Sequence, residues 1–425
     1  MNDQNNILLG PAFKSFPPQA WDMTAEEFLK TRPRLSSFQT PVLTLDRKAL
    51  DHNLKSMMFW CKESGVQLAP HGKTTMAPQL WKEQLKAGAW GITLATIWQV
   101  QFARSVGINR ILMANQLIDP VGLEWVAGEF LRDASFDFYC WADQIEQLEL
   151  MSTVFSAAHT DRPLNVIVEL GASEGRTGAR TTAAAYELAL AIDKAPGLQL
   201  AGVGGYEGVL SRDRTPAGLA RVSAYLEALC GLHRRLNEEG LYRSSALLTV
   251  GGSAFFDLVA AHCAPEADPS GDFGTPTTVL LRSGAYLTHD SGHYAEISPL
   301  EQPGATQTLK AAIHGWTRIL SNPEKDLCIF DAGKRDLPHD FDMPNPQVLL
   351  NKHREGPVAD ISSNQILKLN DQHGFMKGES LPIGSVVRLG LSHPCTAFDK
   401  WRLVPVIDDA DQGDPEVVDL VQLFF

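Results

Sequence analysis

The middle of the chain alternates short strand-like runs with stretches long enough to form a helix. Eight runs are rich in aliphatic and β-branched residues and are bounded by turn residues. They are Val66–Ala69, Gly91–Thr96, Arg110–Asn115, Phe136–Trp141, Leu164–Leu170, Leu198–Gly204, Ala246–Val250 and Thr278–Arg282. Eight strands with crossovers in one stretch of roughly 220–250 residues fit a closed barrel better than an open sheet. We therefore predict an α/β fold built on a (β/α)8 TIM barrel.

The stretches between these runs carry helical patterns. Thr182–Lys194 is rich in Ala, Leu and Glu, and Ala217–Glu239 repeats apolar residues three and four positions apart. The step Ile118-Asp119-Pro120 is typical of a helix start, with Asp119 as the N-cap and Pro120 in the first turn. These patterns predict the helices that a barrel needs between its parallel strands.

After about residue 300 the long helical patterns give way to strand-like runs and loops rich in Pro, Asp and Asn. The runs are Gln307–His314, Leu327–Asp331, Val386–Leu391 and Leu403–Val406. They predict a smaller, mainly β domain, which the strand-like Pro41–Leu45 is expected to join. We place the barrel at residues 50–300 and the β domain at residues 1–49 and 301–425.

Charge and cysteine content limit the partners and the compartment. The net charge of -13 argues against nucleic acid or an anionic membrane as the main partner. No apolar run approaches membrane-spanning length, and no signal peptide is evident at the N-terminus. The six cysteines show no paired framework, as expected for reduced thiols. We expect a soluble, cytoplasmic protein whose partner is a small molecule.

The candidate functional residues follow the strands, because chemistry in a barrel takes place at the carboxyl ends of its strands. His71-Gly72-Lys73-Thr74 follows the first predicted strand. A lysine there points into a pocket, where desolvation lowers its pKa and frees the amine as a Schiff-base nucleophile. A lysine considered alone is more often solvated or ion-paired, so the other strand ends have to support this hypothesis.

Three further strand ends carry polar groups suited to a planar ligand. Asn115 and Gln116 follow the third strand and offer amides for hydrogen bonding. Arg176 lies within Glu-Gly-Arg-Thr-Gly after the fifth strand, where it equally suits a loop-pinning ion pair. Tyr206 stands close to glycines after the sixth strand, where packing and ligand contact are comparably expected.

Glycine-rich turns follow the seventh and eighth strands. They are Gly251-Gly252-Ser253 and Ser283-Gly284, the second of which precedes Tyr286. Such turns expose backbone N–H groups and form the recurrent phosphate site of barrels, although either turn alone is more often only structural. Two turns on adjacent strands, together with the strand-end lysine, are the minimal set of parts for binding pyridoxal phosphate.

His393 and Cys395 stand two positions apart after the strand-like Val386–Leu391. On an extended segment both side chains point the same way, and imidazole with thiolate suits Zn²⁺. Two ligands leave the other positions to water, substrate or cofactor, which describes a catalytic metal. A lone His-x-Cys is by default a partly buried pair without metal.

In this order the motifs resemble the D-serine dehydratase / D-threonine aldolase family, fold-type III pyridoxal phosphate enzymes related to alanine racemase. The resemblance runs from about Pro41 to Trp401 and rests on Pro70-His71-Gly72-Lys73-Thr74, Asn115-Gln116, Gly175-Arg176-Thr177-Gly178, Gly204-Gly205-Tyr206-Glu207-Gly208, Gly251-Gly252-Ser253, Ser283-Gly284-Ala285-Tyr286 and Ser392-His393-Pro394-Cys395.

The resemblance implies a homodimer whose subunits combine an alanine racemase-like barrel with a β domain. It implies Lys73 as the catalytic Schiff-base lysine and His393 with Cys395 as the metal pair. The resemblance implies that dehydratases of the family carry a His-x-Cys motif and bind zinc, whereas aldolases carry His-x-Asp and bind a harder metal. Cys395 therefore favours dehydration. The candidate cofactor-binding residues are Lys73, His71, Gln116, Arg176, Tyr206, Gly251, Gly252, Ser253, Ser283, Gly284 and Tyr286.

The first hypothesis is a lyase that converts a β-hydroxy D-amino acid, D-serine or D-threonine, into a 2-oxo acid and ammonia. The Lys73 amine would remove the α-proton, and zinc would stabilise the leaving hydroxyl. One alternative is an aldolase that yields glycine and an aldehyde. A racemase needs no metal, and a non-catalytic cofactor carrier is typically a single-domain barrel, so both are less favoured.

Overall fold

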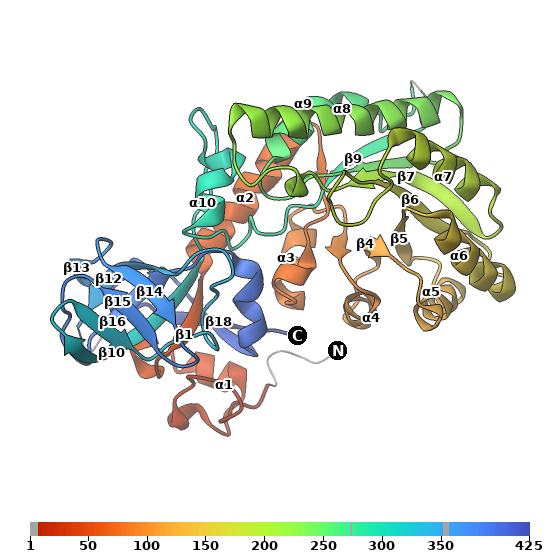
Figure 1. Cartoon of the computed structure of the whole chain (residues 1–425). Helices are drawn as coiled ribbons and strands as arrows, with labels where there is room; N and C mark the ends of the chain where they lie inside the picture. Colours follow the sequence, from red (N-terminus) through yellow and green to blue (C-terminus); the bar gives the residue numbers. More distant parts are fainter. Residues whose placement is uncertain (1–6, 273, 352–356) are drawn as a thin grey trace. The chain divides into compact units, whose positions relative to one another are not determined.

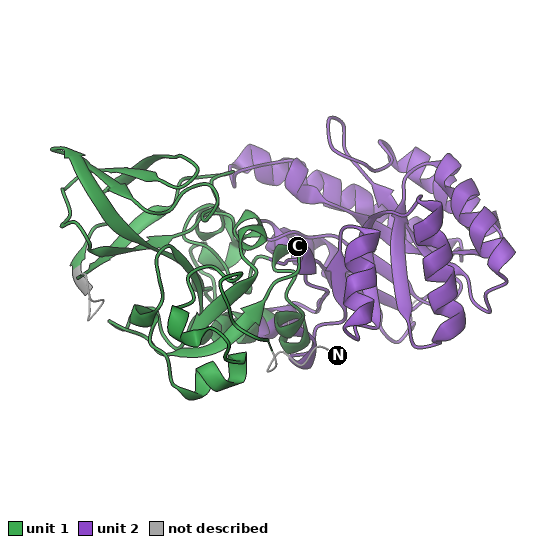
Figure 2. Cartoon of the chain, turned by 90° about the horizontal axis from the view of Figure 1, so that it is seen from below, with its two compact units in different colours: residues 1–57, 74–83, 285–425 green, residues 58–73, 84–284 purple. Residues whose placement is uncertain are grey.

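The computed structural model describes residues 7–272, 274–351 and 357–425, which fold into two compact units (Figure 2). The barrel unit comprises residues 58–73 and 84–284, and the β unit comprises residues 1–57, 74–83 and 285–425. The chain enters each unit more than once, so neither unit is one continuous segment.

The barrel unit is built on parallel strands. They are β2 (Gln67–Leu68), β3 (Ile92–Leu94), β4 (Arg110–Gln116), β5 (Asp137–Ala142), β6 (Leu164–Leu170), β7 (Leu198–Gly205), β8 (Ala246–Thr249) and β9 (Thr277–Leu281). Their order is β2-β9-β8-β7-β6-β5-β4-β3, and a parallel bridge between His71 and Thr93 connects the two ends of this order. The predicted (β/α)8 barrel is therefore confirmed (Figure 1). Each of the eight predicted barrel strands overlaps an observed strand.

Helices alternate with these strands. They are α2 (Arg47–Glu63), α3 (Pro78–Lys86), α4 (Ile97–Ser105), α5 (Pro120–Arg132), α6 (Ile145–Ala158), α7 (Thr182–Lys194), α8 (Pro216–Glu238) and α9 (Phe256–Cys263). Helix α5 begins as predicted, because the Asp119 carboxylate accepts hydrogen bonds from the amides of Val121 (2.8 Å) and Gly122 (3.2 Å). Within the described ranges, no helix combines the length and apolar character needed to cross a bilayer.

Apolar side chains from most of the strands fill the barrel interior. The buried cluster consists of Ala69, Leu112, Trp141, Ile167, Ala201, Leu247 and Leu280. Close packing in this layer makes the strands a rigid scaffold, and the loops at their carboxyl ends are held by it.

The β unit contains a second sheet. Its strands are β1 (Val42–Asp46), β10 (Ile313–Glu324), β11 (Leu327–Phe330), β12 (Asn345–Leu350), β13 (Pro357–Asp360), β14 (Gln365–Leu369), β15 (Gly374–Lys377), β16 (Val386–Gly390), β17 (Leu403–Ile407) and β18 (Val417–Gln422). The order is β13-β12-β16-β10-β1-β17-β18, with β11, β15 and β14 attached through β10. Strand β1 pairs with β10 and β17, so the N-terminal strand joins the β unit as predicted.

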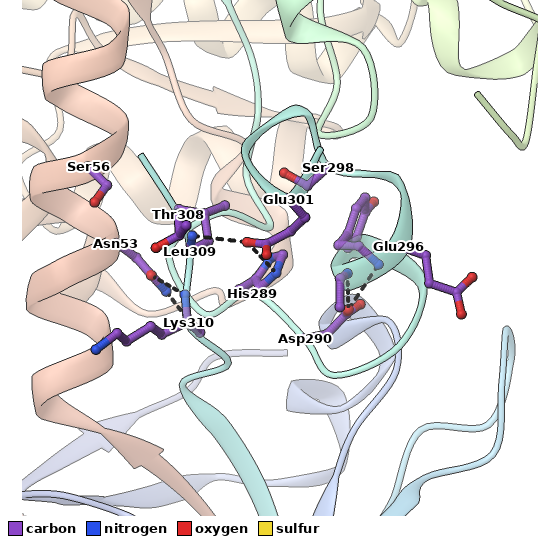
Figure 3. Close-up of polar contacts among 12 residues, drawn as sticks. Asn53, Ser56, His289, Asp290, Glu296, Ser298, Glu301, Thr308, Leu309 and Lys310 are labelled. Carbon is purple, nitrogen blue, oxygen red and sulfur yellow. Dashed lines mark hydrogen bonds and ion pairs between the residues drawn. The ribbon is translucent and has the colours of Figure 1, made fainter. Parts of the chain in front are cut away.

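The strand predicted at Gln307–His314 is wrong over most of its length, since β10 begins only at Ile313. Side chains engage the backbone before that point. The amide of Leu309 donates to Glu301 Oε1 (3.0 Å), and the amide of Lys310 donates to Asn53 Oδ1 (2.7 Å), as Figure 3 shows. These amides are therefore not available for pairing with a neighbouring strand.

Short helices are found in both units. Helix α1 (Ala25–Lys30) starts with a capping box formed by Thr24 and Glu27, and α10 (His293–Ile297) follows the barrel strands in sequence. The single-turn 3-10 helices are η2 (Pro18–Ala20), η3 (Leu35–Ser37), η4 (Gly72–Thr74), η5 (Glu207–Val209), η6 (Ala264–Glu266), η7 (Pro299–Glu301), η8 (Pro394–Thr396) and η9 (Phe398–Lys400), some of which belong to the barrel unit.

A buried histidine makes the stability of the barrel unit depend on pH. His233 on α8 is 1% exposed and hydrogen-bonds the hydroxyl of Tyr242 (3.1 Å), and burial lowers the pKa of His233 to about 4. The unfolded histidine takes up a proton near pH 6.5. The unfolding free energy is therefore expected to fall as pH drops from about 6.5 to about 4, by up to about 1.4 kcal/mol per pH unit.

Urea unfolding of the natural protein and of His233→Phe at several pH values measures this contribution. The variant is expected to be less stable at neutral pH, because Tyr242 loses its hydrogen-bond partner. Its unfolding free energy should decline less steeply with acid. Identical pH slopes for the two proteins would show that His233 does not titrate as burial requires.

Candidate active site

Lys73 follows β2 in the short helix η4, at the carboxyl end of the barrel. Next to it, His71 has a buried Nδ1 atom for which the described residues provide no hydrogen-bond partner. Burial holds the pKa of His71 well below its usual range, and the positive charges of Lys73, Arg282 and Arg176 lower it further. Three cationic side chains therefore surround a neutral imidazole, an environment suited to an anionic ligand.

Arg282 is a buried cation that the sequence analysis did not include among the site residues. It follows β9, is 5% exposed, and donates hydrogen bonds to Thr249 Oγ1 (2.8 Å) and to the carbonyl of Gly205. Its guanidinium lies over the ring of Trp141, 4.9 Å from the centroid. Burial lowers its pKa, but a guanidinium keeps its charge in a protein, so Arg282 places a positive charge inside the barrel.

Gln116 is held by a buried carboxylate. Its Nε2 donates to Glu169 Oε2 (2.6 Å), and Thr177 Oγ1 donates to Glu169 Oε1 (3.1 Å). Burial raises the pKa of Glu169, which is partly offset by these hydrogen bonds. Glu169 thus connects the end of β4 with the loop after β6 and fixes the orientation of the Gln116 amide.

Arg176 and Tyr206 form a stacked pair. The Arg176 guanidinium lies 4.8 Å from the centroid of the Tyr206 ring. The same ring packs against Gly252, where a β-carbon would come within 2.8 Å of Tyr206 Cε2. Tyr206 therefore connects the loop after β6 with the turn after β8, and glycine at position 252 makes room for the ring.

The glycine turns after β8 and β9 pack closely on their surroundings. A β-carbon at Gly284 would come within 2.6 Å of the His71 carbonyl oxygen, so glycine is required next to the lysine loop. Ser283 Oγ donates to the carbonyl of Gly252 (2.6 Å), which joins the two turns. The amides of Gly251 and Gly252 are bound by Glu207, another carboxylate that sequence reasoning missed.

The barrel unit thus brings together nearly all of the predicted cofactor-binding residues. Tyr286 is the exception, because it belongs to the β unit, where it is buried. The members assembled at the carboxyl ends of the barrel strands are His71, Lys73, Gln116, Arg176, Tyr206, Gly251, Gly252, Ser253, Ser283 and Gly284.

The predicted metal pair lies in the β unit after β16, but the prediction of an extended segment is wrong, because Cys395 falls in the 3-10 helix η8 and His393 is its N-cap residue. His393 adopts a left-handed backbone conformation (φ 62°), and its Nδ1 lies 2.6 Å from Asp340 Oδ2. Thr396 Oγ1 donates to the other oxygen of Asp340 (2.6 Å), and Cys395 Sγ lies 3.5 Å from Thr74 Oγ1. Burial lowers the pKa of His393, but hydrogen bonds to Cys395 and Asp340 outweigh it and raise the pKa to about 9.

A further carboxylate, that of Asp290, holds the loop that carries this pair. Asp290 Oδ2 accepts a hydrogen bond from the His393 amide (2.9 Å), and its Oδ1 accepts from the amide of Tyr294 in α10 (2.9 Å). Figure 3 shows Asp290, and His289 close to Glu301. The distance from His289 Nε2 to Glu301 Oε1 is 3.6 Å. The loop is therefore fixed through its backbone as well as through its side chains.

The part of the chain that the structure describes contains no cluster of three or more His, Cys, Asp or Glu side chains arranged to hold a metal ion. His393 and Cys395 supply two adjacent ligands of the type that zinc prefers. A metal on this pair would need its other ligands from water or from a bound molecule.

Several solved structures share this fold. A D-threonine aldolase from Filomicrobium marinum superposes with a TM-score of 0.75 at 23% identity, over 92% of this chain and 96% of that one. A D-threo-3-hydroxyaspartate dehydratase from Delftia sp. HT23 gives 0.72 at 20% identity, over 92% and 99%. An alanine racemase-like protein from Idiomarina loihiensis gives 0.68 at 19% identity, over 90% and 98%. The fold is therefore an alanine racemase-like barrel with a β domain.

Proteins similar in sequence give further evidence about the family. Residues 312–407 match the family model described as "Putative serine dehydratase domain". A D-threonine aldolase of Arthrobacter sp. is 26% identical over 382 residues, 88% of this chain and 90% of the relative. A 3-hydroxy-D-aspartate aldolase of Paracoccus denitrificans is 28% identical over 367 residues, 83% of this chain and 87% of the relative. These similarities support the D-serine dehydratase / D-threonine aldolase family, the one that the motifs resemble.

Proposed function

We propose that this chain is a pyridoxal phosphate-dependent lyase that converts a β-hydroxy D-amino acid into a 2-oxo acid and ammonia. The observation that carries the proposal is the position of Lys73, at the carboxyl end of a barrel strand and two residues from His71, whose pKa is lowered by burial and by the charges of Lys73, the buried Arg282 and the exposed Arg176. The family relatives support the class of reaction, since they act on D-threonine and 3-hydroxy-D-aspartate.

The residues of the barrel unit fit the cofactor. The unpartnered Nδ1 of His71 is a buried polar atom that a bound ring could satisfy, and the turns at Gly252 and Gly284 have no room for a β-carbon. Lys73 would hold the cofactor through its amine, and the turns that contain Ser253 and Gly284 would hold the phosphate. Pyridoxal phosphate, when bound, supplies the electron sink that makes the α-proton of an amino acid removable.

The side chains of this chain would then act on the substrate as acid, base and electrostatic groups. The Lys73 amine would remove the α-proton of the substrate as general base. Loss of the β-hydroxyl as water leaves an enamine, which hydrolyses to the 2-oxo acid and ammonia.

His393 and Cys395 would hold Zn²⁺. Zinc, when bound, supplies a Lewis acid for a hydroxyl that leaves poorly unaided. Thiolate favours zinc over harder divalent metals, which is the feature of this chain that favours dehydration. Asp340 would accept a hydrogen bond from Nδ1 of His393 and leave Nε2 to the metal, as carboxylates behind zinc-bound histidines do.

Asp340→Ala is expected to weaken zinc binding by about ten- to a hundred-fold, because the ring of His393 loses the partner that orients it. Competition with a chromogenic chelator measures the affinity directly. Asp399→Ala, which removes an exposed carboxylate from the nearby η9, serves as the matched control. Equal zinc affinities for the two variants would show that Asp340 does not support the metal pair.

The second candidate function is aldol cleavage, favoured by the names of the two sequence relatives. Product analysis with D-serine, D-threonine and 3-hydroxy-D-aspartate separates the two reactions. Ammonia and a 2-oxo acid in equal amounts are expected from a dehydratase. Glycine and an aldehyde without ammonia would overturn the proposal and establish an aldolase.

A further inference from the structure

Glu207 is a fully buried carboxylate at the carboxyl end of β7, in the short helix η5. Both of its oxygens are engaged by the turn that follows β8. The amide of Gly251 donates to Oε2 (3.1 Å), and the amide of Gly252 donates to Oε1 (2.8 Å). A carboxylate that accepts from two successive amides fixes both peptide planes at once.

The other side of the same turn is held by the end of β9. The amide of Arg282 donates to the carbonyl of Gly251 (3.0 Å), and Ser283 Oγ donates to the carbonyl of Gly252 (2.6 Å). Gly251 has a φ of +105°, a conformation that side chains rarely adopt. The orientation of the turn is therefore set by Glu207 on its amide side and by β9 on its carbonyl side.

This arrangement changes the expected roles of the two glycines. The sequence predicts that the amides of Gly251 and Gly252 donate to a phosphate, whereas both amides are aimed at Glu207. The groups left to contact a phosphate would then be those of the following residue, Ser253, and of Gly284 in the neighbouring turn. Their placement depends on how the two glycine peptides are held.

We infer that Glu207 is a positioning residue for the phosphate group of the cofactor, which it serves by holding the Gly251-Gly252 turn in its binding conformation. The inference rests on the proposed function, because it assumes that the cofactor's phosphate binds at these turns. Glu207 itself need not contact the cofactor.

The geometry around Glu207 suits a carboxylate, because both oxygens accept hydrogen bonds from amides. Burial raises the pKa of its carboxyl group above the ordinary value, and the two amide hydrogen bonds and the charge of Arg282 offset this rise only in part. If the carboxylate were absent, two buried N–H groups would lack an acceptor, and the turn would rearrange to satisfy them.

Glu207→Gln tests the inference with little change in volume. The glutamine oxygen can accept from one amide, but its NH₂ group faces the other N–H donor, so the turn loses one of its two bonds. Pyridoxal phosphate binding to cofactor-free protein is measured by fluorescence, next to the binding of pyridoxal, which lacks the phosphate. The dissociation constant for pyridoxal phosphate is expected to rise about ten-fold or more, while that for pyridoxal stays within about two-fold.

Two further variants separate positioning from general stability. Glu129→Gln removes a carboxylate of comparable burial, which pairs with Arg104 on the outer helices of the same unit, and it should leave both affinities unchanged. Glu207→Asp keeps the charge on a shorter side chain that reaches the turn less well, so it should give an intermediate loss of pyridoxal phosphate affinity. If Glu207→Gln does not fold, the same two affinities are measured for Glu207→Asp instead.

The outcomes are distinct. A loss confined to the phosphate-bearing ligand supports the inference. An equal loss for both ligands, or unchanged or tighter binding of pyridoxal phosphate by the Glu207 variants, overturns it. If the natural protein binds no pyridoxal phosphate, the proposed function itself fails, and that result does not depend on any Glu207 variant.

Discussion

Replacing Lys73 by alanine is expected to lower turnover of β-hydroxy D-amino acids by more than about a thousand-fold. The substitution removes both the amine that would hold the cofactor and the base that would take the α-proton. The unfolding free energy should change by less than about 1 kcal/mol, because Lys73 is only partly buried in a short turn. Steady-state kinetics and urea unfolding of the purified variant measure the two effects separately.

Lys86→Ala is the matched control for this prediction. Lys86 lies exposed in the last turn of α3, so the same loss of charge there should leave activity unchanged. Retention of most activity in Lys73→Ala would show that another amine carries the chemistry, and the assignment of the strand-end lysine would then be wrong.

Loss of the metal pair should have the second-largest effect. His393→Ala and Cys395→Ala are each expected to lower ammonia release by about a hundred- to a thousand-fold, because Lewis-acid assistance to a poor leaving group is worth several kcal/mol. Binding of pyridoxal phosphate should be retained, since the residues proposed to hold it lie in the barrel unit. Metal content by elemental analysis and cofactor absorption distinguish the two losses.

Controls for the metal prediction come from the same unit. His373→Ala removes an exposed histidine and should change neither metal content nor activity. Zinc added back to chelator-treated natural protein should restore ammonia release, and Cys395→Asp should shift preference towards harder cations. Full activity in protein shown to be free of metal would exclude the dehydration mechanism proposed for His393 and Cys395.

Local sequence patterns were sufficient to predict the architecture. Each barrel strand is a short apolar run between turn residues, and such runs specify strands without reference to distant parts of the chain. The signal for the start of α5 was equally local, because Asp119 accepts hydrogen bonds from amides only two and three residues away. The strand predicted at Gln307–His314 failed where distant side chains, Asn53 and Glu301, bind its backbone amides.

The carboxylates that organise the candidate sites could not be found in this way. Glu207 binds amides 44 and 45 positions further along the chain, and Asp340 is 53 positions from His393. No local sequence pattern predicts such pairs, because only the closed barrel and the folded β unit bring their members together. Arg282 did leave a signal, because a charged residue directly after an apolar barrel strand is unusual unless it is buried with partners.

Reductive trapping tests the central claim most directly. Borohydride fixes pyridoxal phosphate to the amine that holds it, and mass mapping of the digested protein then identifies the modified residue. We predict that the added mass is found on the peptide that contains Lys73 and that it is absent when Lys73→Ala is treated in the same way. Modification of a different lysine in the natural protein, or no modification after incubation with the cofactor, would contradict the assignment.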